Sequence, residues 1–169
     1  IKLYSNDKKF LKYNIDVSKP FTLITVHPET VNPVNNSQNT KILINVLKKY
    51  NFQKIFKFKN NDFDSNKIRK LILEYEMVHE DVICFEALGQ VGYYSFLKKC
   101  QFLIGNSSSS IIEAASFGKM AINIGNRQNG RMQSGNIINV PFNEEQIKNS
   151  VDTVIKKNTF YGKNKYYKK

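Results

Sequence analysis

The sequence predicts an α/β fold, a Rossmann-like parallel sheet with helices on both of its faces. Short apolar segments alternate with amphipathic helical segments along most of the chain, which favours β–α–β units with right-handed crossovers. The apolar segments contain few alternating polar residues, as is typical of strands in a sheet that is covered on both faces. Polar side chains follow the ends of these strands, where such folds bind their ligands.

Six strands and five helices are expected. The first strand, at 21–26, is rich in β-branched and apolar residues and ends before Pro28, because proline cannot continue a central strand. Other short apolar runs predict strands at 54–58, 82–85, 102–105, 121–124 and 137–140. Apolar residues at helical spacing predict helices at 39–50, 65–79, 91–100, from the serines after Asn106 to a stop at Gly118, and at 144–157.

The 169 residues are expected to form one domain, at 21–157. Residues 1–20 are polar and mixed, so they are expected to form a connector, with a short helix near Asp7–Tyr13. Residues 158–169 are expected to form a basic tail that does not pack against the domain.

The formal net charge of +12 raises the question of nucleic-acid binding. Half of this excess lies in residues 156–169, which contain six lysines and no acidic residue. The remaining positive residues are mostly lysines, whereas specific nucleic-acid binders use arginine and stacked aromatic residues. We therefore expect no nucleic-acid partner, with a basic nucleic-acid-binding module as the alternative.

The sequence shows no apolar run of membrane-spanning length and no signal peptide. Cys84 and Cys100 lack the spacing of metal ligands and are expected to be free thiols in a reducing compartment. No G-x-G-x-x-G motif follows the first strand, which argues against a dinucleotide cofactor. The expectation is a cytoplasmic protein with no membrane partner, no metal and no cofactor.

The stretch from Phe102 to Gly118 carries the strongest site signal. A predicted buried strand is followed by a break and then by four serines, which favour the start of a helix. Backbone N–H groups at such a start attract phosphate, so Ser107 and Ser108 are candidate phosphate ligands. Glu113 lies about one turn further on, where its carboxylate can accept hydrogen bonds from a ribose diol. The alternative is a plain helix cap followed by a solvated surface glutamate.

Further polar candidates follow the other predicted strands. His27, Asn60, Leu88, Arg127 and Arg131 all come after strand ends, which meet at one edge of a parallel sheet. An arginine beside a phosphate turn is suited to bidentate contacts with oxyanions. The alternatives are a structural, hydrogen-bonded histidine and ordinary loop arginines.

Four segments together resemble the hydrolysing UDP-N-acetylglucosamine 2-epimerases, in the same order. They are VHPET at 26–30, LGQVGYYS at 88–95, GNSSSSIIEA at 105–114 and NIGNRQNGR at 123–131. The match covers about residues 20–140 and corresponds to the second, nucleotide-binding half of these enzymes. The resemblance implies the second of two Rossmann-like domains in a GT-B-type arrangement, with the nucleotide-sugar domain of a GT-B glycosyltransferase as the alternative.

The resemblance also implies roles for the candidate residues. Ser107 and Ser108 would hold the diphosphate of UDP, and Glu113 its ribose. The backbone around Leu88 would bind uracil, with Asn60 nearby. The three remaining residues lie on the diphosphate side, His27 and Arg127 as catalytic residues and Arg131 as a further ligand of the UDP moiety.

The family's reaction eliminates UDP, passes through a glycal and adds water to give N-acetylmannosamine for sialic-acid-type sugar synthesis. Its acidic catalytic residues come mainly from the first half, and no pair of carboxylates in this chain follows a strand end. We therefore expect this chain to bind UDP modestly without turnover. The implied partners are a UDP-sugar substrate and the N-terminal domain of the same protein, which this sequence lacks. The resemblance also allows a homo-oligomer.

Overall fold

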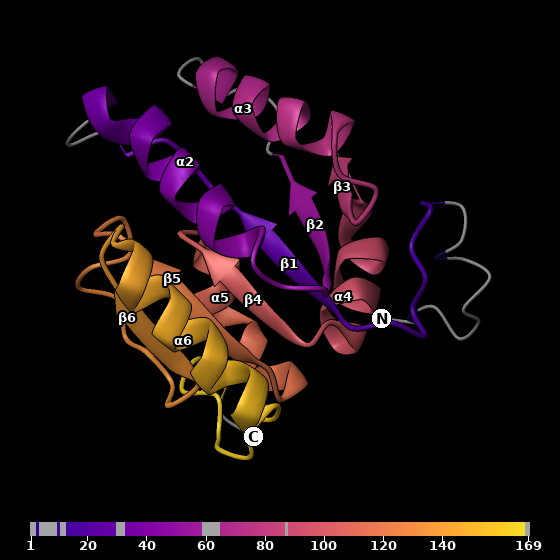
Figure 1. Cartoon of the computed structure of the whole chain (residues 1–169). Coiled ribbons are helices and arrows are strands. Elements are labelled where there is room, and N and C mark those ends of the chain that lie inside the picture. Colours follow the sequence, from indigo (N-terminus) through magenta and orange to yellow (C-terminus); the bar gives the residue numbers. More distant parts are fainter. Residues whose placement is uncertain are drawn as a thin grey trace.

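The computed structural model describes residues 3, 10, 13–29, 33–58, 65–86 and 88–167. Within these residues the chain forms one six-stranded sheet with the strand order β3-β2-β1-β4-β5-β6, and every neighbouring pair is parallel. Figure 1 shows the sheet with helices packed against it. The predicted parallel α/β fold is confirmed.

The element bounds agree with the predicted ranges to within a few residues. The strands are β1 (Phe21–Thr25), β2 (Gln53–Lys57), β3 (Val82–Phe85), β4 (Phe102–Gly105), β5 (Met120–Ile124) and β6 (Ile137–Val140). The helices are α2 (Asn36–Leu47), α3 (Ser65–Met77), α4 (Gly89–Lys99), α5 (Ser108–Ile112) and α6 (Glu144–Lys157), with 3-10 turns η1 (Pro33–Asn35) and η2 (Ala114–Phe117).

One helix differs from its prediction. The segment expected to be a single helix after the serines is a short α5 followed by the 3-10 turn η2. Gly118 ends η2 in the left-handed region at φ 66°, as the predicted stop requires.

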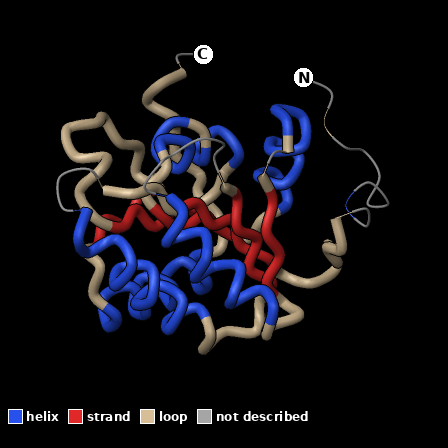
Figure 2. The backbone as a smooth tube through the Cα atoms, turned by 90° about the horizontal axis from the view of Figure 1, so that it is seen from above, coloured by secondary structure: helices blue, strands red, loops and turns tan. Residues whose placement is uncertain are grey.

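Helices cover both faces of the sheet, which Figure 2 shows as a layer between two layers of helices. Side chains of α2, α3 and α6 pack on one face with Ile24 and Ile104, and α4 packs on the other with Leu23 and Leu103. Successive residues of a strand point to opposite faces, so each strand supplies both hydrophobic clusters. This explains why the strands are apolar without polar alternation.

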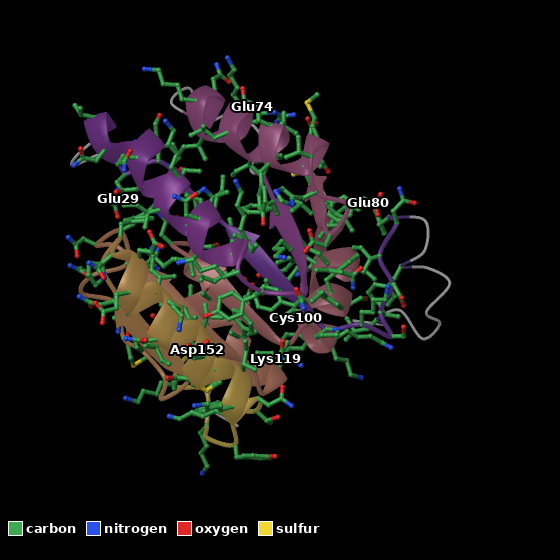
Figure 3. The ribbon with its side chains drawn as sticks, viewed as in Figure 1. Glu29, Glu74, Glu80, Cys100, Lys119 and Asp152 are labelled. Carbon is green, nitrogen blue, oxygen red and sulfur yellow. The ribbon has the colours of Figure 1, made fainter. Side chains whose placement is uncertain are left out.

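The N-terminal segment is more than the expected connector. Phe10 and Ile15 are buried in the hydrophobic cluster that contains α4, together with Cys100, which is labelled in Figure 3. The Gln53 side chain donates to the carbonyl of Asp16 at 2.7 Å and accepts from its N–H at 3.1 Å. Described residues of the N-terminal segment therefore contribute to the hydrophobic cluster on the α4 face of the sheet. The helix predicted near 7–13 lies mostly outside the described residues.

The C-terminal segment is corrected from an unpacked tail to a packed one. The backbone N–H of Phe160 donates to the carbonyl of Gly118 at 2.9 Å, and the Phe160 ring packs against the main hydrophobic cluster. The Asn164 side chain donates to the carbonyl of Ile112 at 2.7 Å. Apolar and hydrogen-bonding side chains among the lysines therefore fix the described residues 158–167 to the domain.

Candidate functional site

A cavity of about 630 Å³ opens at the carboxyl ends of β1, β2 and β4. Its walls include Thr25 at the end of β1, Lys57 at the end of β2 and Ser107 after β4. Strand β1 lies between β2 and β4. The connection after β1 leads to β2 on one side, and the connection after β3 leads to β4 on the other side. Such a switch point leaves a crevice between the crossovers, and the volume suits a small-molecule ligand.

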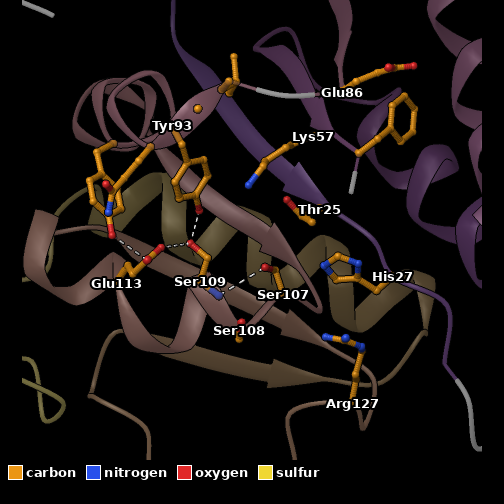
Figure 4. A pocket seen from close by; sticks show the side chains of 15 residues that line it. Thr25, His27, Lys57, Glu86, Tyr93, Ser107, Ser108, Ser109, Glu113 and Arg127 are labelled. Carbon is orange, nitrogen blue, oxygen red and sulfur yellow. Dashed lines mark hydrogen bonds between the residues drawn. The ribbon is translucent and has the colours of Figure 1, made fainter. Parts of the chain in front are cut away.

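Six of the eight predicted site residues line this cavity: His27, Leu88, Ser107, Ser108, Glu113 and Arg127. Figure 4 shows most of their side chains around the opening. Arg131 is exposed on the loop after β5 and does not line the cavity, so the structure does not bring it together with the others. Asn60 lies outside the described residues.

The turn after β4 is fixed by two residues. Gly105 has φ 138°, and a Cβ there would lie 2.0 Å from the carbonyl oxygen of Thr25, so a glycine is needed where β4 presses against β1. The side-chain amide of Asn106 accepts from the N–H of His27 at 2.7 Å and donates to its carbonyl at 2.8 Å. These bonds extend the pairing of β1 and β4 and hold His27 beside the turn.

The serine turn begins as predicted. Ser107 caps α5, because its hydroxyl accepts from the N–H of Ser109 at 3.3 Å. The hydroxyls of Ser107 and Ser108 both line the cavity, next to the first backbone N–H groups of the helix. The turn therefore presents small hydrogen-bond donors to a ligand.

The Glu113 carboxylate lies in a hydrogen-bond network and not on an open surface. Tyr94 donates to one carboxylate oxygen at 2.9 Å, and the hydroxyl of Ser109 donates to the other. The hydroxyl of Tyr93 is paired in turn with that of Ser109. The bond to Glu113 raises the pKa of Tyr94, and burial raises the pKa of Tyr93, so both tyrosines stay protonated. Glu113 is thus half-buried and hydrogen-bonded in the cavity wall, which differs from a fully solvated surface glutamate.

Lys57 is a cavity residue that the sequence analysis missed. It ends β2, and its Nζ lies 4.3 Å from the centroid of the Tyr93 ring, within cation–π distance. Burial lowers the pKa of Lys57, and the negative charge of Glu113 opposes that shift. The available signal was a lysine at the end of a strand, whereas the candidates named from the sequence all follow strand ends.

The loop after β5 is tied to the loops after β1 and β4. Arg127 Nη1 donates to the carbonyl of Asn106 at 3.3 Å, and the Gln128 amide donates to the same oxygen at 2.8 Å. The carboxylate of Glu29 accepts from the N–H of Asn126 at 3.0 Å. These bonds place the Arg127 guanidinium at the cavity, beside His27 in Figure 4.

The site therefore combines hydroxyl, N–H, guanidinium and ammonium donors with two carboxylates, those of Glu86 and Glu113. Such a set can bind an anion at one part and a polyhydroxyl group at another. Nowhere in the described part of the chain do three or more His, Cys, Asp or Glu side chains gather as a metal site would need. The helices of that part are also too short or too polar to cross a membrane.

Comparison with known proteins identifies a family. The family described as UDP-N-acetylglucosamine 2-epimerase matches residues 2–169. The curated GDP/UDP-N,N'-diacetylbacillosamine 2-epimerase (hydrolyzing) of Campylobacter jejuni subsp. jejuni is 35% identical over 139 residues, which cover 81% of this chain and 36% of that protein. The UDP-N,N'-diacetylbacillosamine 2-epimerase (hydrolyzing) of Legionella pneumophila subsp. pneumophila is 33% identical over 136 residues, covering 80% of this chain and 36% of that protein.

Solved structures share the fold. The S. aureus MnaA structure with UDP has a TM-score of 0.73 at 17% identity, over 99% of this chain and 45% of that one. The chain thus spans about a third of the length of the curated relatives it matches and under half of this solved structure. The family match covers nearly all of the chain, and the relatives match four fifths of it. The chain belongs to the UDP-N-acetylglucosamine 2-epimerase family.

Proposed function

We propose that this chain is the nucleotide-binding half of a hydrolysing UDP-N-acetylglucosamine 2-epimerase, and that UDP binds in the cavity at the strand ends. One observation carries the proposal. The same cavity contains a donor-rich serine turn and, about one helical turn away, a carboxylate held by hydrogen bonds. These are the two chemistries that a nucleoside diphosphate needs, one for its phosphates and one for its ribose.

The diphosphate fits the donor side of the cavity. Ser107 and Ser108 offer hydroxyl and backbone N–H donors, which suit phosphate oxygens. His27 and Arg127 line the same side and add an imidazole and a guanidinium, the latter able to bind oxyanions through two parallel bonds. In Figure 4 these groups surround one part of the cavity.

The ribose fits at Glu113. A carboxylate has about four acceptor positions, and Tyr94 and Ser109 occupy one on each oxygen. The positions that remain can accept from both hydroxyls of a ribose diol without breaking the network. Leu88 lies at the start of α4 on the same cavity, where its backbone would bind uracil as the family resemblance implies.

We further propose that the full enzyme eliminates UDP from UDP-N-acetylglucosamine and hydrates the resulting glycal to N-acetylmannosamine, for sialic-acid-type sugar synthesis. Departure of UDP develops negative charge on the diphosphate, and His27 and Arg127 would stabilise that charge electrostatically. Proton removal at the sugar needs a base in hydrogen-bond reach. Among the described residues Glu29 is the acid next to His27 in the sequence, and its carboxylate accepts from the Asn126 N–H, so we assign the base to the other half of the enzyme.

Two measurements on the purified chain test this proposal. Calorimetric titration with UDP should give a Kd between about 1 μM and 1 mM, since the cavity lacks the opposing domain that would exclude water. Incubation with UDP-N-acetylglucosamine, followed by proton NMR, should give no free N-acetylmannosamine. No UDP binding at millimolar concentration would contradict the proposal, and a tight, sequence-selective complex with nucleic acid at physiological salt would favour the basic-module alternative.

A further inference from the structure

Lys57 presents to the cavity an ammonium group that forms no salt bridge with any residue in the described part of the chain. The side chain is half-buried and extends from the end of β2 into the cavity, as Figure 4 shows. Its Nζ lies over the ring of Tyr93, 4.3 Å from the ring centroid. In the described part of the chain no residue forms a salt bridge or a hydrogen bond with this ammonium.

The nearby carboxylate is already engaged. Both oxygens of Glu113 accept hydrogen bonds, from Tyr94 and from Ser109. The acceptor positions that remain on Glu113 are those assigned to the ribose, and the three N–H donors of the Lys57 ammonium form no hydrogen bond with a described residue, although burial has removed part of their water. A partly desolvated charge is costly until it finds an acceptor, so the cavity is suited to a ligand that supplies one.

The charge balance of the cavity points to the same conclusion. Its described lining contains one lysine and one arginine, Lys57 and Arg127, and two acidic residues, Glu86 and Glu113. Without Lys57 the formal charge of this lining would be negative, which would repel a diphosphate. Figure 4 shows the Lys57 ammonium directed into the cavity from the end of β2. Ser107, in the serine turn after β4, lines the same cavity.

We propose that Lys57 binds the phosphate of the nucleotide held by the serine turn, contacting it from the β2 wall of the cavity. The inference rests on the proposed function, since it assigns a further ligand to the same site. An ammonium is a compact charge with three donors and suits phosphate oxygens that the serine turn leaves open. Its contact is strengthened by the partial burial that removes competing water.

The test compares three ligands on one variant. Lys57→Met keeps the length and the apolar stem against Tyr93 but removes the charge. Calorimetric titrations with UDP, UMP and uridine should show affinities for UDP and UMP reduced by about 10- to 100-fold, as expected for a hydrogen bond to a charged group. The affinity for uridine should change less than about twofold, because uridine has no phosphate. The matched control is Lys98→Met, at an exposed lysine of α4 outside the cavity, which should bind all three ligands like the wild type.

The decisive quantity is the ratio of the UMP affinity to the uridine affinity. Both ligands are measured on the same sample, so any unfolded fraction of the protein affects both affinities equally and cancels in their ratio. Lys57→Arg, which keeps the positive charge, should retain most of the phosphate preference. Equal UDP affinity for Lys57→Met and wild type would overturn the inference and leave the proposed function standing. Uridine weakened as much as UDP would also overturn it, because Lys57 would then contact the nucleoside. A wild-type chain that does not bind UDP would overturn both.

Discussion

The side-chain amide of Asn106 forms two hydrogen bonds with the backbone of His27, accepting from its N–H and donating to its carbonyl. Asn106 itself is almost fully buried, and its own carbonyl accepts from Arg127 and Gln128. One residue therefore connects the loops after β1, β4 and β5, which carry the predicted catalytic pair. The geometry of the site therefore depends on the buried Asn106 as well as on the side chains that face the cavity.

Replacing Asn106 by alanine should lower the free energy of unfolding by about 1–3 kcal/mol, because two backbone groups of His27 lose their partners in a buried place. UDP affinity should fall with it, since His27 is no longer held beside the serine turn, whereas the backbone carbonyl that accepts from Arg127 is kept. Urea denaturation and calorimetry measure the two effects. Asn129→Ala, at an exposed asparagine of the same loop as Arg127, is the control and should change neither. Equal stability of Asn106→Ala and wild type would show that the amide does not hold the loops.

Replacing Glu113 by glutamine should weaken UDP binding by about 1–3 kcal/mol, because a charge-assisted acceptor for the ribose diol is lost. The 2′,3′-dideoxy analogue of UDP should bind wild type poorly and should be insensitive to the substitution. Isothermal titration of both ligands gives the comparison, with the exposed Glu145→Gln on α6 as the control. If the dideoxy analogue lost affinity to the same extent as UDP, Glu113 would act through Tyr94 and Ser109 and not through the ribose.

Replacing Phe160 by alanine should destabilise the domain by about 1 kcal/mol, less than the roughly 1.5–3 kcal/mol of a fully buried phenylalanine, because its side chain is partly buried. Its ring packs against the main hydrophobic cluster, whereas the neighbouring Tyr161 is 92% exposed. Tyr161→Ala is therefore the matched control and should melt like the wild type. Thermal unfolding followed by circular dichroism distinguishes the two, and identical melting of both variants would mean that residues 158–167 do not stabilise the fold.

Both cysteines should be unreactive in the folded chain. Burial raises the pKa of Cys84 to about 12, helped by the negative charge of Glu76, and burial raises that of Cys100 to about 12 as well. At pH 8 only about one thiol in ten thousand would be ionised. A chromogenic disulfide reagent should therefore react slowly with the native chain and rapidly with two thiols after denaturation. Fast reaction of one thiol in the native chain would contradict the burial of that cysteine.

The same pKa values set a limit on alkaline stability. The reference pKa of a thiol is 9.0, so unfolded thiols ionise above about pH 9 while the folded ones keep their protons up to about pH 12. The contribution of these protonated thiols is complete below pH 9 and is lost as the pH rises from 9 to 12. The midpoint of urea unfolding should fall over this range, and the double variant Cys84→Ser, Cys100→Ala should show a smaller fall.

The local pattern of apolar and polar residues in the sequence determined where most strands and helices of this protein lie. Apolar runs of strand length, helical stripes and Gly118 located the elements to within a few residues, because each signal depends on neighbours in the sequence. The strict alternation of strands and helices left a parallel sheet as the expected topology, and a parallel sheet brings its strand ends to one edge. That rule placed His27, Ser107, Arg127 and other candidates around one cavity before any contact between them was known.

The tertiary structure alone decided which distant residues contact one another around the cavity and in the core. Lys57 belongs to the site because the pairing of β2 with its neighbours directs this side chain into the cavity, and the direction of a strand residue follows from the register. The network of Glu113 with Tyr94 and Ser109 joins α4 to α5, and the packing of Phe160 joins the C-terminal segment to the core. Arg131 follows the same strand as Arg127, but of the two only Arg127 lines the cavity, where it donates to the carbonyl of Asn106. Such contacts join residues far apart in the chain, and their energies depend on positions that only the folded packing defines.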